Sequence, residues 1–265
     1  MSLTFTILGC GSSAGVPRVG QGWGACDPEN PKNRRRRCSL LVERGENNAA
    51  KTQVLVDMSP DLRDQLLGLN IGRLDAVLLT HAHADHIHGI DDMRPLVLMA
   101  RRKIDLFMDD ATSASVRTKF GYIFETPPGS CYPALLTDHR LISGSKTIIN
   151  GPGGPVAAVP FRLEHGEIDA LGFRFERVAY CPDLNAIPDE SVAFLEGLDV
   201  WIVDALRYTS HPSHFCLDET LRWIEKLRPA RAILTNLHTD LDFVRLKSEL
   251  PPNVEPAFDG MQITA

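Results

Sequence analysis

The chain has 265 residues, of which 43% are hydrophobic and 23% are charged, and this composition is ordinary for a globular protein. Its formal net charge is −6 at pH 7, so no overall positive field favours a long nucleic acid as a partner. Six cysteines are scattered along the chain without C-x-x-C spacing. We therefore expect reduced thiols, and a core large enough to be stable without disulfides.

The first residues, MSLTFTILGCGSS, alternate as in a strand and contain no basic leader before an apolar stretch. No apolar run approaches the roughly 18 residues that would cross a bilayer. We therefore expect a cytoplasmic protein with no membrane contact. No linker or repeat divides the chain, which predicts a single domain over residues 1–265. The sequence leaves the oligomeric state open, and a homodimer is compatible with it.

The first part of the chain predicts strands followed by a helix. Residues 3–8 are predicted as a strand that leads into the glycine-rich turn GCGSSAGVP. Residues 38–43 and 53–57 are predicted as paired strands, joined by the polar segment RGENNAAK. The segment SPDLRDQLLGLN begins at Ser59 and predicts a helix, because a serine cap, an early proline and regularly spaced leucines favour one. Residues 74–80, LDAVLLT, form a continuous apolar run of strand length.

The second part of the chain again predicts strands followed by a helix. Residues 104–154 are rich in proline and glycine and show no clear period. Two alternating runs follow, PVAAVPFRLEH and GFRFERVAY, and they indicate the strands of a hairpin. The last quarter predicts strand, helix and strand in DVWIVDA, LDETLRWIEKL and ARAILT. Strands early and late, with helices after them in each half, predict an α/β fold with helices packed outside two sheets.

Residues 80–92, THAHADHIHGIDD, place four histidines and three aspartates directly after the apolar run. Imidazole and carboxylate together are the ligand set of zinc and similar divalent ions. Polar residues at the carboxyl end of a buried strand usually carry chemistry. In a tight turn, His81 and His83 would point to one side and Asp85 and His86 to another. Two metal ions could then lie side by side.

A solvated charged loop, or a helix start that Asp85 caps, is the alternative interpretation of this segment. Four ligand-type residues spaced H-x-H-x-D-H after a buried strand favour the metal site, because such a motif carries a coordination mechanism. His88 lies beyond the motif. Extra histidines near a metal are more often hydrogen-bonded neighbours of the ligands than ligands themselves.

The motif T-H-x-H-x-D-H, with a glycine three residues later, resembles the signature of the metallo-β-lactamase superfamily. G-x-G-S-x-x-G-V-P at residues 9–17, D-H-I-H-G-I-D-D, and F-D-G-M at residues 258–261 are similar to the branch that contains the phosphoribosyl cyclic phosphodiesterase. The resemblance implies a four-layer αββα sandwich with a metal site at one edge. It also implies two divalent metal ions per chain, zinc first and manganese as the alternative.

The superfamily pattern requires three further ligands. His165 follows the strand-like run VPFRL, and Asp183 in AYCPD is implied to bridge the two ions, although an aspartate there is also typical of a turn. The branch commonly has a histidine directly after L-T, but ILTNLHTDLD has Asn236 there and His238 two residues later. We expect His238 to take this role, with Asn236 as the alternative. The resemblance thus implies one ion bound by His81, His83 and His165, and a second bound by Asp85, His86 and His238, with Asp183 between them.

Two such ions can share a bridging hydroxide and hold the oxygens of a phosphoryl centre. Asp85 would also orient the hydroxide. His214, in HPSHFCLDET, matches the place of the non-ligand catalytic histidine of the branch and would protonate the leaving group. His214 could equally be an ordinary loop residue, and His211 shares this ambiguity. The sequence thus predicts a dinuclear metal-dependent phosphodiesterase acting on a small cyclic or nucleotide-like phosphate ester.

Two other functions compete with this prediction. The endonucleases that process the 3′ ends of tRNA share the ligand motif, but the acidic balance of the chain disfavours tRNA binding. The missing final histidine would also suit a one-metal nucleotide-binding sensor with weak or no catalysis. Thioester or lactone hydrolysis is a further alternative for such a metal site.

Three other features have two interpretations each. Asp57 and Asp204 each end a predicted strand, where a carboxylate can orient a metal-bound imidazole or cap the following turn. Residues 34–37 are four consecutive arginines, which would hold a phosphate or, more commonly, form a solvated face.

Overall fold

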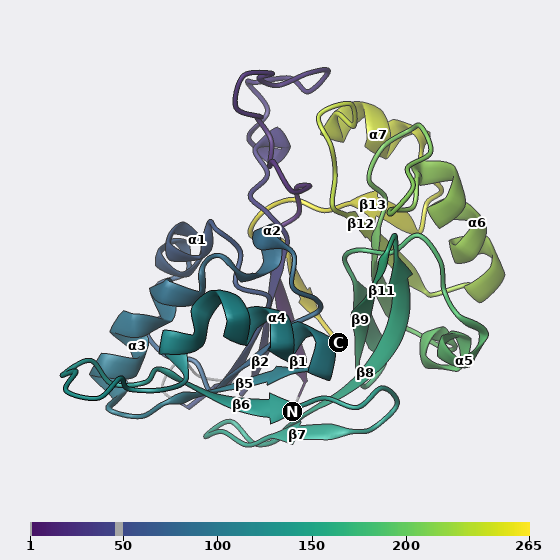
Figure 1. Cartoon of the computed structure of the whole chain (residues 1–265). Coiled ribbons are helices and arrows are strands. Elements are labelled where there is room, and N and C mark those ends of the chain that lie inside the picture. Colours follow the sequence, from purple (N-terminus) through teal and green to yellow (C-terminus); the bar gives the residue numbers. More distant parts are fainter. Residues whose placement is uncertain (1, 46–49) are drawn as a thin grey trace.

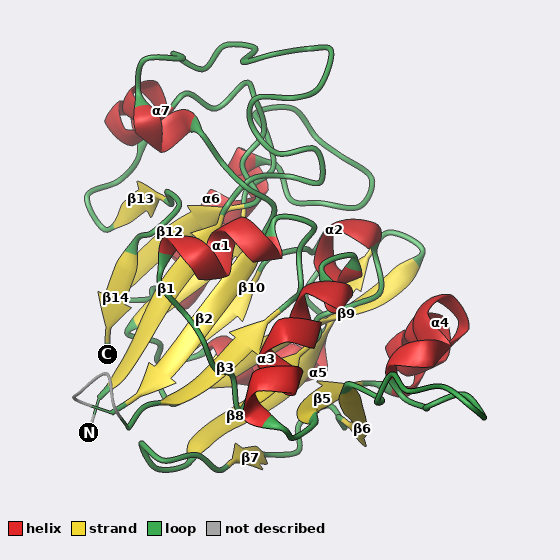
Figure 2. Ribbon diagram, turned by 90° about the vertical axis from the view of Figure 1, so that its left-hand side faces the viewer, coloured by secondary structure: helices red, strands yellow, loops and turns green. Residues whose placement is uncertain are grey.

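The computed structural model describes residues 2–45 and 50–265, which form two β-sheets packed face to face between helices (Figure 1, Figure 2). The first sheet has the order β14 (Gln262–Thr264), β1 (Leu3–Gly9), β2 (Ser39–Arg44), β3 (Thr52–Val56), β4 (Ala76–Leu78), β5 (Ile104–Met108) and β6 (Leu136–Arg140). The second has the order β13 (Val254–Pro256), β12 (Arg231–Thr235), β11 (Val200–Asp204), β10 (Val178–Cys181), β9 (Ile168–Phe175), β8 (Val156–His165) and β7 (Thr147–Ile149).

Helices cover the outer face of each sheet. The first sheet carries α1 (Leu62–Gly68), α2 (Ala84–Ile87), α3 (Met93–Ala100) and α4 (Asp110–Phe120), and the second carries α5 (Asp189–Val192), α6 (Leu217–Leu227) and α7 (Phe243–Glu249). Single 3₁₀ turns are η1 (Pro31–Asn33), η2 (Ile90–Asp92), η3 (Gly121–Ile123) and η4 (Ala193–Leu195). None of the helices in the described part of the chain is long and apolar enough to cross a membrane. The predicted αββα sandwich is confirmed.

Apolar side chains fill all three spaces between the layers. Phe5 and Phe175 meet edge to face between the sheets, with ring centroids 5.8 Å apart. Leu55 and Leu106 are buried on the helix-covered side of the first sheet. Trp201 is buried on the corresponding side of the second sheet. Strands buried on both faces read as continuous apolar runs, which explains why LDAVLLT shows no alternation.

The strand directions bring polar residues to one edge of the sandwich. β3, β4, β5 and β6 run parallel to one another, and so do β10, β11, β12 and β13. The carboxyl ends of parallel strands meet at the same edge of a sheet. The histidine-rich segment follows β4, and Asp204 ends β11. Both sheets therefore deliver ligand-type residues to the same region.

The structure corrects two local predictions. The run GFRFERVAY is not one strand, because the chain turns at Glu176, which has a φ of 53°, and returns as β10 antiparallel to β9. The predicted helix at Ser59 begins later, at Leu62, although the Ser59 hydroxyl accepts a hydrogen bond from the Asp61 amide at 3.1 Å, as a capping residue does. Part of the predicted connection RGENNAAK, residues 46–49, lies outside the described residues.

Candidate metal centre

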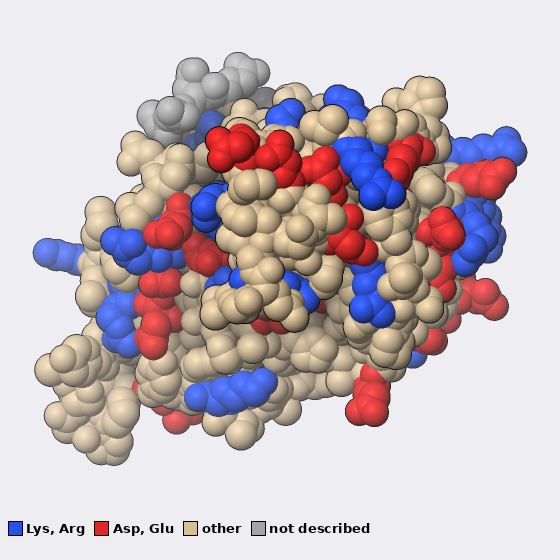
Figure 3. Space-filling view, turned by 90° about the horizontal axis from the view of Figure 1, so that it is seen from above, with Lys and Arg blue, Asp and Glu red and all other residues tan. Residues whose placement is uncertain are grey.

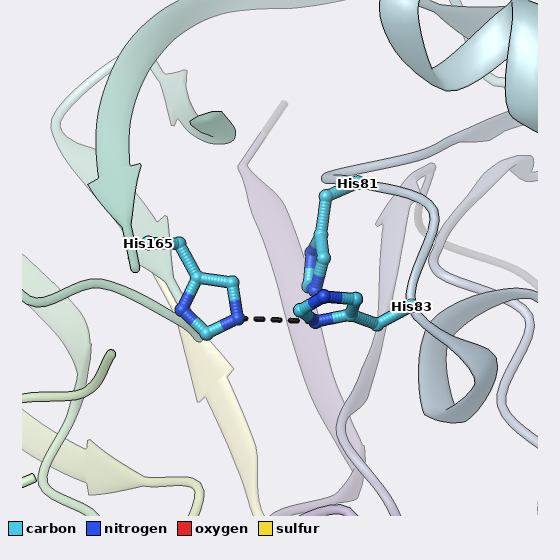
Figure 4. A group of neighbouring side chains, drawn as sticks. All are labelled: His81, His83 and His165. Atoms are coloured by element: carbon cyan, nitrogen blue, oxygen red, sulfur yellow. Dashed lines mark hydrogen bonds between the residues drawn. The ribbon is translucent and has the colours of Figure 1, made fainter. Parts of the chain in front are cut away.

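Histidines from two strand ends and an aspartate from a third converge at the edge shared by the two sheets. His81 and His83 follow β4, His165 ends β8, and Asp183 lies two residues beyond β10. Figure 4 shows the ring of His165 facing those of His81 and His83, with 3.1 Å between His165 Nε2 and His83 Nδ1. Residues separated by more than 80 positions thus meet side by side.

Three overlapping groups of side chains have the spacing of metal ligands. Within each group the potential ligand atoms all lie within 4.8 Å of one another. The groups are His81, His83 and His165; His81, His86 and Asp183; and His165, Asp183 and His214. Asp183 belongs to two of them, which is the position that a bridging carboxylate requires.

Asp85 lies next to the second group. Its Oδ2 is 3.5 Å from His86 Nε2, and Asp183 Oδ1 is 3.4 Å from the same nitrogen. Asp85 and His86 are placed by α2, a single turn that begins directly after His83. The tight turn expected from the sequence is present, but it does not separate the two pairs, because the ring centroids of His81 and His86 lie 4.2 Å apart and both residues belong to the second group.

Two buried polar atoms at the centre have no hydrogen-bond partner among the described residues. These atoms are His81 Nε2 and Asp183 Oδ1. Both side chains are almost fully buried, and His81 Nε2 lies 3.9 Å from Asp183 Oδ2. Leaving a buried donor or acceptor unsatisfied costs about 1–3 kcal/mol. A divalent cation would bind to such atoms and relieve this cost, so the residues present fit a metal ion.

The electrostatics of His81 and Asp183 also suit a cation. Burial lowers the pKa of His81 well below its usual range, and His86 lowers it further, so the ring stays neutral. Burial alone raises the pKa of Asp183, but His86, His214 and His81 together hold it well below its usual range. Metal ligands must be neutral imidazoles and ionised carboxylates. His81 and Asp183 are therefore in the protonation states that a metal requires.

Hydrogen bonds outside the cluster fix the orientation of the imidazoles. His86 Nδ1 donates to Asp57 Oδ2 at 2.7 Å, and the amide of Thr80 donates to Asp57 Oδ1 at 2.8 Å. His165 Nδ1 donates to the carbonyl of Ser213 at 2.6 Å. Such partners set the tautomer, so that Nε2 is left to face the centre. Of the two interpretations of Asp57, the structure supports the one in which it orients an imidazole.

His214 is held by a second carboxylate. His214 Nδ1 donates to Asp204 Oδ2 at 2.8 Å, and Asn236 Nδ2 donates to Asp204 Oδ1 at 3.1 Å. Asp204 is fully buried and also accepts a hydrogen bond from the Leu184 amide at 3.2 Å. Burial alone lowers the pKa of His214, but Asp204 and then Asp183 raise it to about 9 overall. Asp204 therefore orients His214 and favours its protonated form.

The structure does not bring His238 into any of the three ligand groups. Asn236 has a left-handed backbone with a φ of 61°, and the amide of His238 donates to the carbonyl of Leu206 at 2.9 Å. The His238 ring then points elsewhere, and its Nδ1 donates to Asp240 Oδ1 at 3.1 Å. The assignment of His238 as a ligand therefore stays a prediction.

The other candidate residues lie around this centre. His88 is exposed and packs its ring edge to face on Phe120. His211 Nδ1 accepts from the hydroxyl of Ser213 at 3.2 Å. The guanidinium of Arg35 is buried, and it donates to the carbonyl of Leu241 at 2.6 Å. Arg36 pairs with Asp259 and Arg37 with Asp61. Three of the four arginines thus join loops internally, whereas Arg34 is exposed and lies over the ring of Trp23.

The sequence analysis overlooked two residues near the centre. The Ser213 carbonyl orients His165, and Arg18 reaches the same region from the turn after β1. A backbone carbonyl leaves no trace in the amino-acid pattern. Arg18 stands directly after the G-V-P motif at residues 15–17, so only that proximity could have suggested it.

Comparison with known proteins identifies the family. Residues 52–236 match the model of the beta-lactamase superfamily domain. The chain therefore belongs to the metallo-β-lactamase superfamily of hydrolases. A solved structure described as a new diphosphatase from the PhnP family has a TM-score of 0.86 and 33% sequence identity. The similarity covers 98% of this chain and 97% of that one.

Two curated relatives share part of their length with this chain. An octanoyltransferase from Porphyromonas gingivalis (strain ATCC BAA-308 / W83) is 31% identical over 259 residues, covering 97% of this chain and 50% of that protein. A ribonuclease Z from Bradyrhizobium sp. (strain ORS 278) is 26% identical over 178 residues, covering 64% of this chain and 50% of that protein. The chain thus spans about half the length of these two relatives.

Proposed function

We propose that the protein is a metal-dependent phosphodiesterase that hydrolyses a small cyclic or nucleotide-like phosphate ester. The observation that carries the proposal is the overlap of three groups of ligand-type side chains, two of which share Asp183 and one of which includes the imidazole of His214 that Asp204 orients. The similarity to a PhnP-family diphosphatase over nearly the whole chain supports phosphate chemistry.

We propose that His81, His83 and His165 hold one divalent ion, that Asp85 and His86 hold a second, and that Asp183 lies between them. His238 is left out of this set because its ring is tied to Asp240. Ions bound there supply Lewis-acid activation of water and of the phosphoryl oxygens. Mixed histidine and carboxylate ligands accept zinc or manganese, and availability often decides which of them is bound.

The residues of the chain have separate tasks in this proposal. The Asp85 carboxylate accepts a hydrogen bond from the attacking water and so aims its oxygen at phosphorus. The P–O bond to the leaving group breaks, and His214 Nε2 gives its proton to the departing oxygen. Asp204 keeps the other proton of His214 on Nδ1, so that Nε2 is the nitrogen facing the centre.

A substrate panel tests the proposal with metal-reconstituted protein. The panel contains 2′,3′-cyclic and 3′,5′-cyclic nucleotides, ribose cyclic phosphate, a p-nitrophenyl phosphodiester, a precursor tRNA and a thioester. We expect turnover of the small phosphate esters and loss of turnover with a chelator, restored by zinc or manganese. Cleavage of the thioester alone would refute the assignment.

A tRNA-processing endonuclease is the second candidate, favoured by the ribonuclease Z relative. Figure 3 shows basic and acidic side chains mixed over the face seen from above, and the formal net charge is −6. A protein that grips tRNA relies on concentrated positive charge, because phosphate contacts dominate its affinity. Cleavage of the precursor tRNA in preference to the small esters would establish the second candidate.

A further inference from the structure

A pocket of about 170 Å³ adjoins the candidate metal centre, and His214 is common to both. We call it the arginine pocket, and its polar lining comes from loops that follow three different strands. That lining consists of Ser12, Ser13, Arg18, Arg207, His211 and His238, in addition to His214.

Positive charge in the arginine pocket is only partly balanced. Arg18 Nη2 donates to the Ser12 hydroxyl at 3.3 Å, while its buried Nε has no partner among the described residues. Burial lowers the pKa of Arg18, Asp240 opposes this, and the charge of Arg207 lowers the pKa further. An arginine nevertheless stays charged in a protein. Two guanidinium groups therefore line the same pocket.

The nearby carboxylate is already engaged. Asp240 accepts hydrogen bonds from His238 Nδ1 at 3.1 Å and from the amide of Tyr208 at 3.3 Å. Arg207 is fixed in place, because its Nε and Nη2 donate to the carbonyls of Thr209 and Ser210 at 3.0 and 2.6 Å. A pocket with two fixed cations, hydroxyl groups and one engaged carboxylate is complementary to a doubly charged anion.

We propose that the arginine pocket binds a second phosphoryl group of the substrate, on the leaving-group side of the scissile bond. The preferred substrates are then diphosphates, in which the leaving group is itself a phosphate. This inference rests on the proposed function of the same site. The side of the bond follows from His214, which lines the pocket and also lies at the centre where the leaving oxygen departs.

The reaction needs only water as a co-reactant. The water oxygen forms a bond to the attacked phosphorus and releases one proton to the solvent, and the bond from that phosphorus to the bridging oxygen breaks. The bridging oxygen keeps the electron pair and leaves as part of the second phosphate. The guanidinium of Arg18 would hold the oxygens of that phosphate with paired N–H donors, which balances the charge that develops on it.

Two substrates that differ only in the leaving group test the inference. Adenosine 5′-diphosphate and adenosine 5′-(p-nitrophenyl phosphate) both give adenosine 5′-monophosphate, but only the diphosphate has an anionic phosphate to place in the pocket. We expect Arg18→Gln to lower kcat/KM roughly tenfold or more for the diphosphate, the usual effect of losing a charge-assisted hydrogen bond, and about twofold for the aryl ester. Arg18→Lys, which keeps the charge, should lose less.

Arg63→Gln is the matched control, because Arg63 is exposed on α1 and forms an ion pair with its neighbour Asp64, away from the pocket. It should leave both substrates unaffected. Equal losses for the two substrates with Arg18→Gln would overturn the pocket assignment. So would wild-type hydrolysis of the aryl ester without hydrolysis of the diphosphate, although the proposed function would then stand.

A binding measurement separates the inference from the proposed function. Calorimetry on the metal-loaded chain compares adenosine 5′-(α,β-methylene)diphosphate with adenosine 5′-monophosphate and with inorganic phosphate. We expect the diphosphate analogue to bind roughly tenfold more tightly than the monophosphate, and Arg18→Gln to abolish the difference. If the analogue binds more tightly only when Arg18 is present, but the chain hydrolyses none of the phosphate esters in the substrate panel, the pocket assignment stands and the proposed function is contradicted. Equal affinities for the two nucleotides, or inorganic phosphate binding as tightly as the analogue, overturn the inference.

Discussion

Replacement of Asp204 by asparagine tests whether His214 serves as the proton donor. The change keeps the volume of a fully buried side chain but removes the charge that accepts from His214 Nδ1 at 2.8 Å and from Asn236 Nδ2 at 3.1 Å. A hydrogen bond to a charged group is worth about 1.5–3 kcal/mol, and about 1.4 kcal/mol is a tenfold change in rate. Asp204→Asn should therefore lower kcat roughly 10- to 150-fold where the leaving oxygen needs a proton.

The assay compares an alkyl phosphodiester with a p-nitrophenyl phosphodiester, whose leaving group departs without protonation. Asp204→Asn should slow the alkyl ester by the full factor and the aryl ester far less. Asp105→Asn is the matched control, since Asp105 accepts from His139 at 2.8 Å in the same way but at a half-exposed site on β5. If both esters slow equally and metal is lost as well, His214 is a ligand and not the acid.

Three further changes are expected to separate metal binding from folding. Asp183→Ala should shed metal, and full occupancy by elemental analysis would exclude a bridging role. Asp57→Asn should weaken metal binding roughly 10- to 100-fold in chelator competition, because His86 loses its partner at 2.7 Å. An unchanged metal affinity would show that Asp57 does not orient a metal ligand. Arg35→Met should lower the free energy of unfolding by about 1–3 kcal/mol, measured in urea, since it leaves the carbonyls of Leu241 and His238 without this donor but contacts none of the residues proposed to hold the ions. Loss of metal without a change in the free energy of unfolding would contradict a purely structural role of Arg35.

The sequence predicted the layers and most of the convergence because both depend on local patterns. An apolar run followed by ligand-type residues places His81 and His83 at a strand end, and parallel strands share that edge. His165 and Asp183 could be found in the same way, since each follows a strand-like run. The break at Glu176 was missed because glutamate is not a typical residue for a left-handed turn, and only the packing of β10 beside β9 requires one there.

Contacts between residues far apart in the sequence determine the features that local patterns could not predict. The direction of the chain after β12 depends on the amide of Leu237, which donates to the carbonyl of Cys10 at 2.8 Å, more than 200 residues away in sequence. Arg35 turns inward because it reaches the carbonyls of Leu241 and His238, which also come from that distant loop. No local period encodes such pairings, so four consecutive arginines resemble a solvated face in the sequence alone.

Asn236 links the two halves of the candidate site. The related branch commonly has a histidine at this place, and a histidine could ligate a metal but could not donate from two amide protons to a carboxylate. Here the Asn236 amide donates to one carboxylate oxygen of Asp204, and the other oxygen accepts a hydrogen bond from His214 Nδ1. Where the branch commonly has that histidine, the chain thus has a second hydrogen-bond donor to Asp204, the carboxylate that orients His214. His238, displaced into the arginine pocket by the same turn, becomes available to contact substrate.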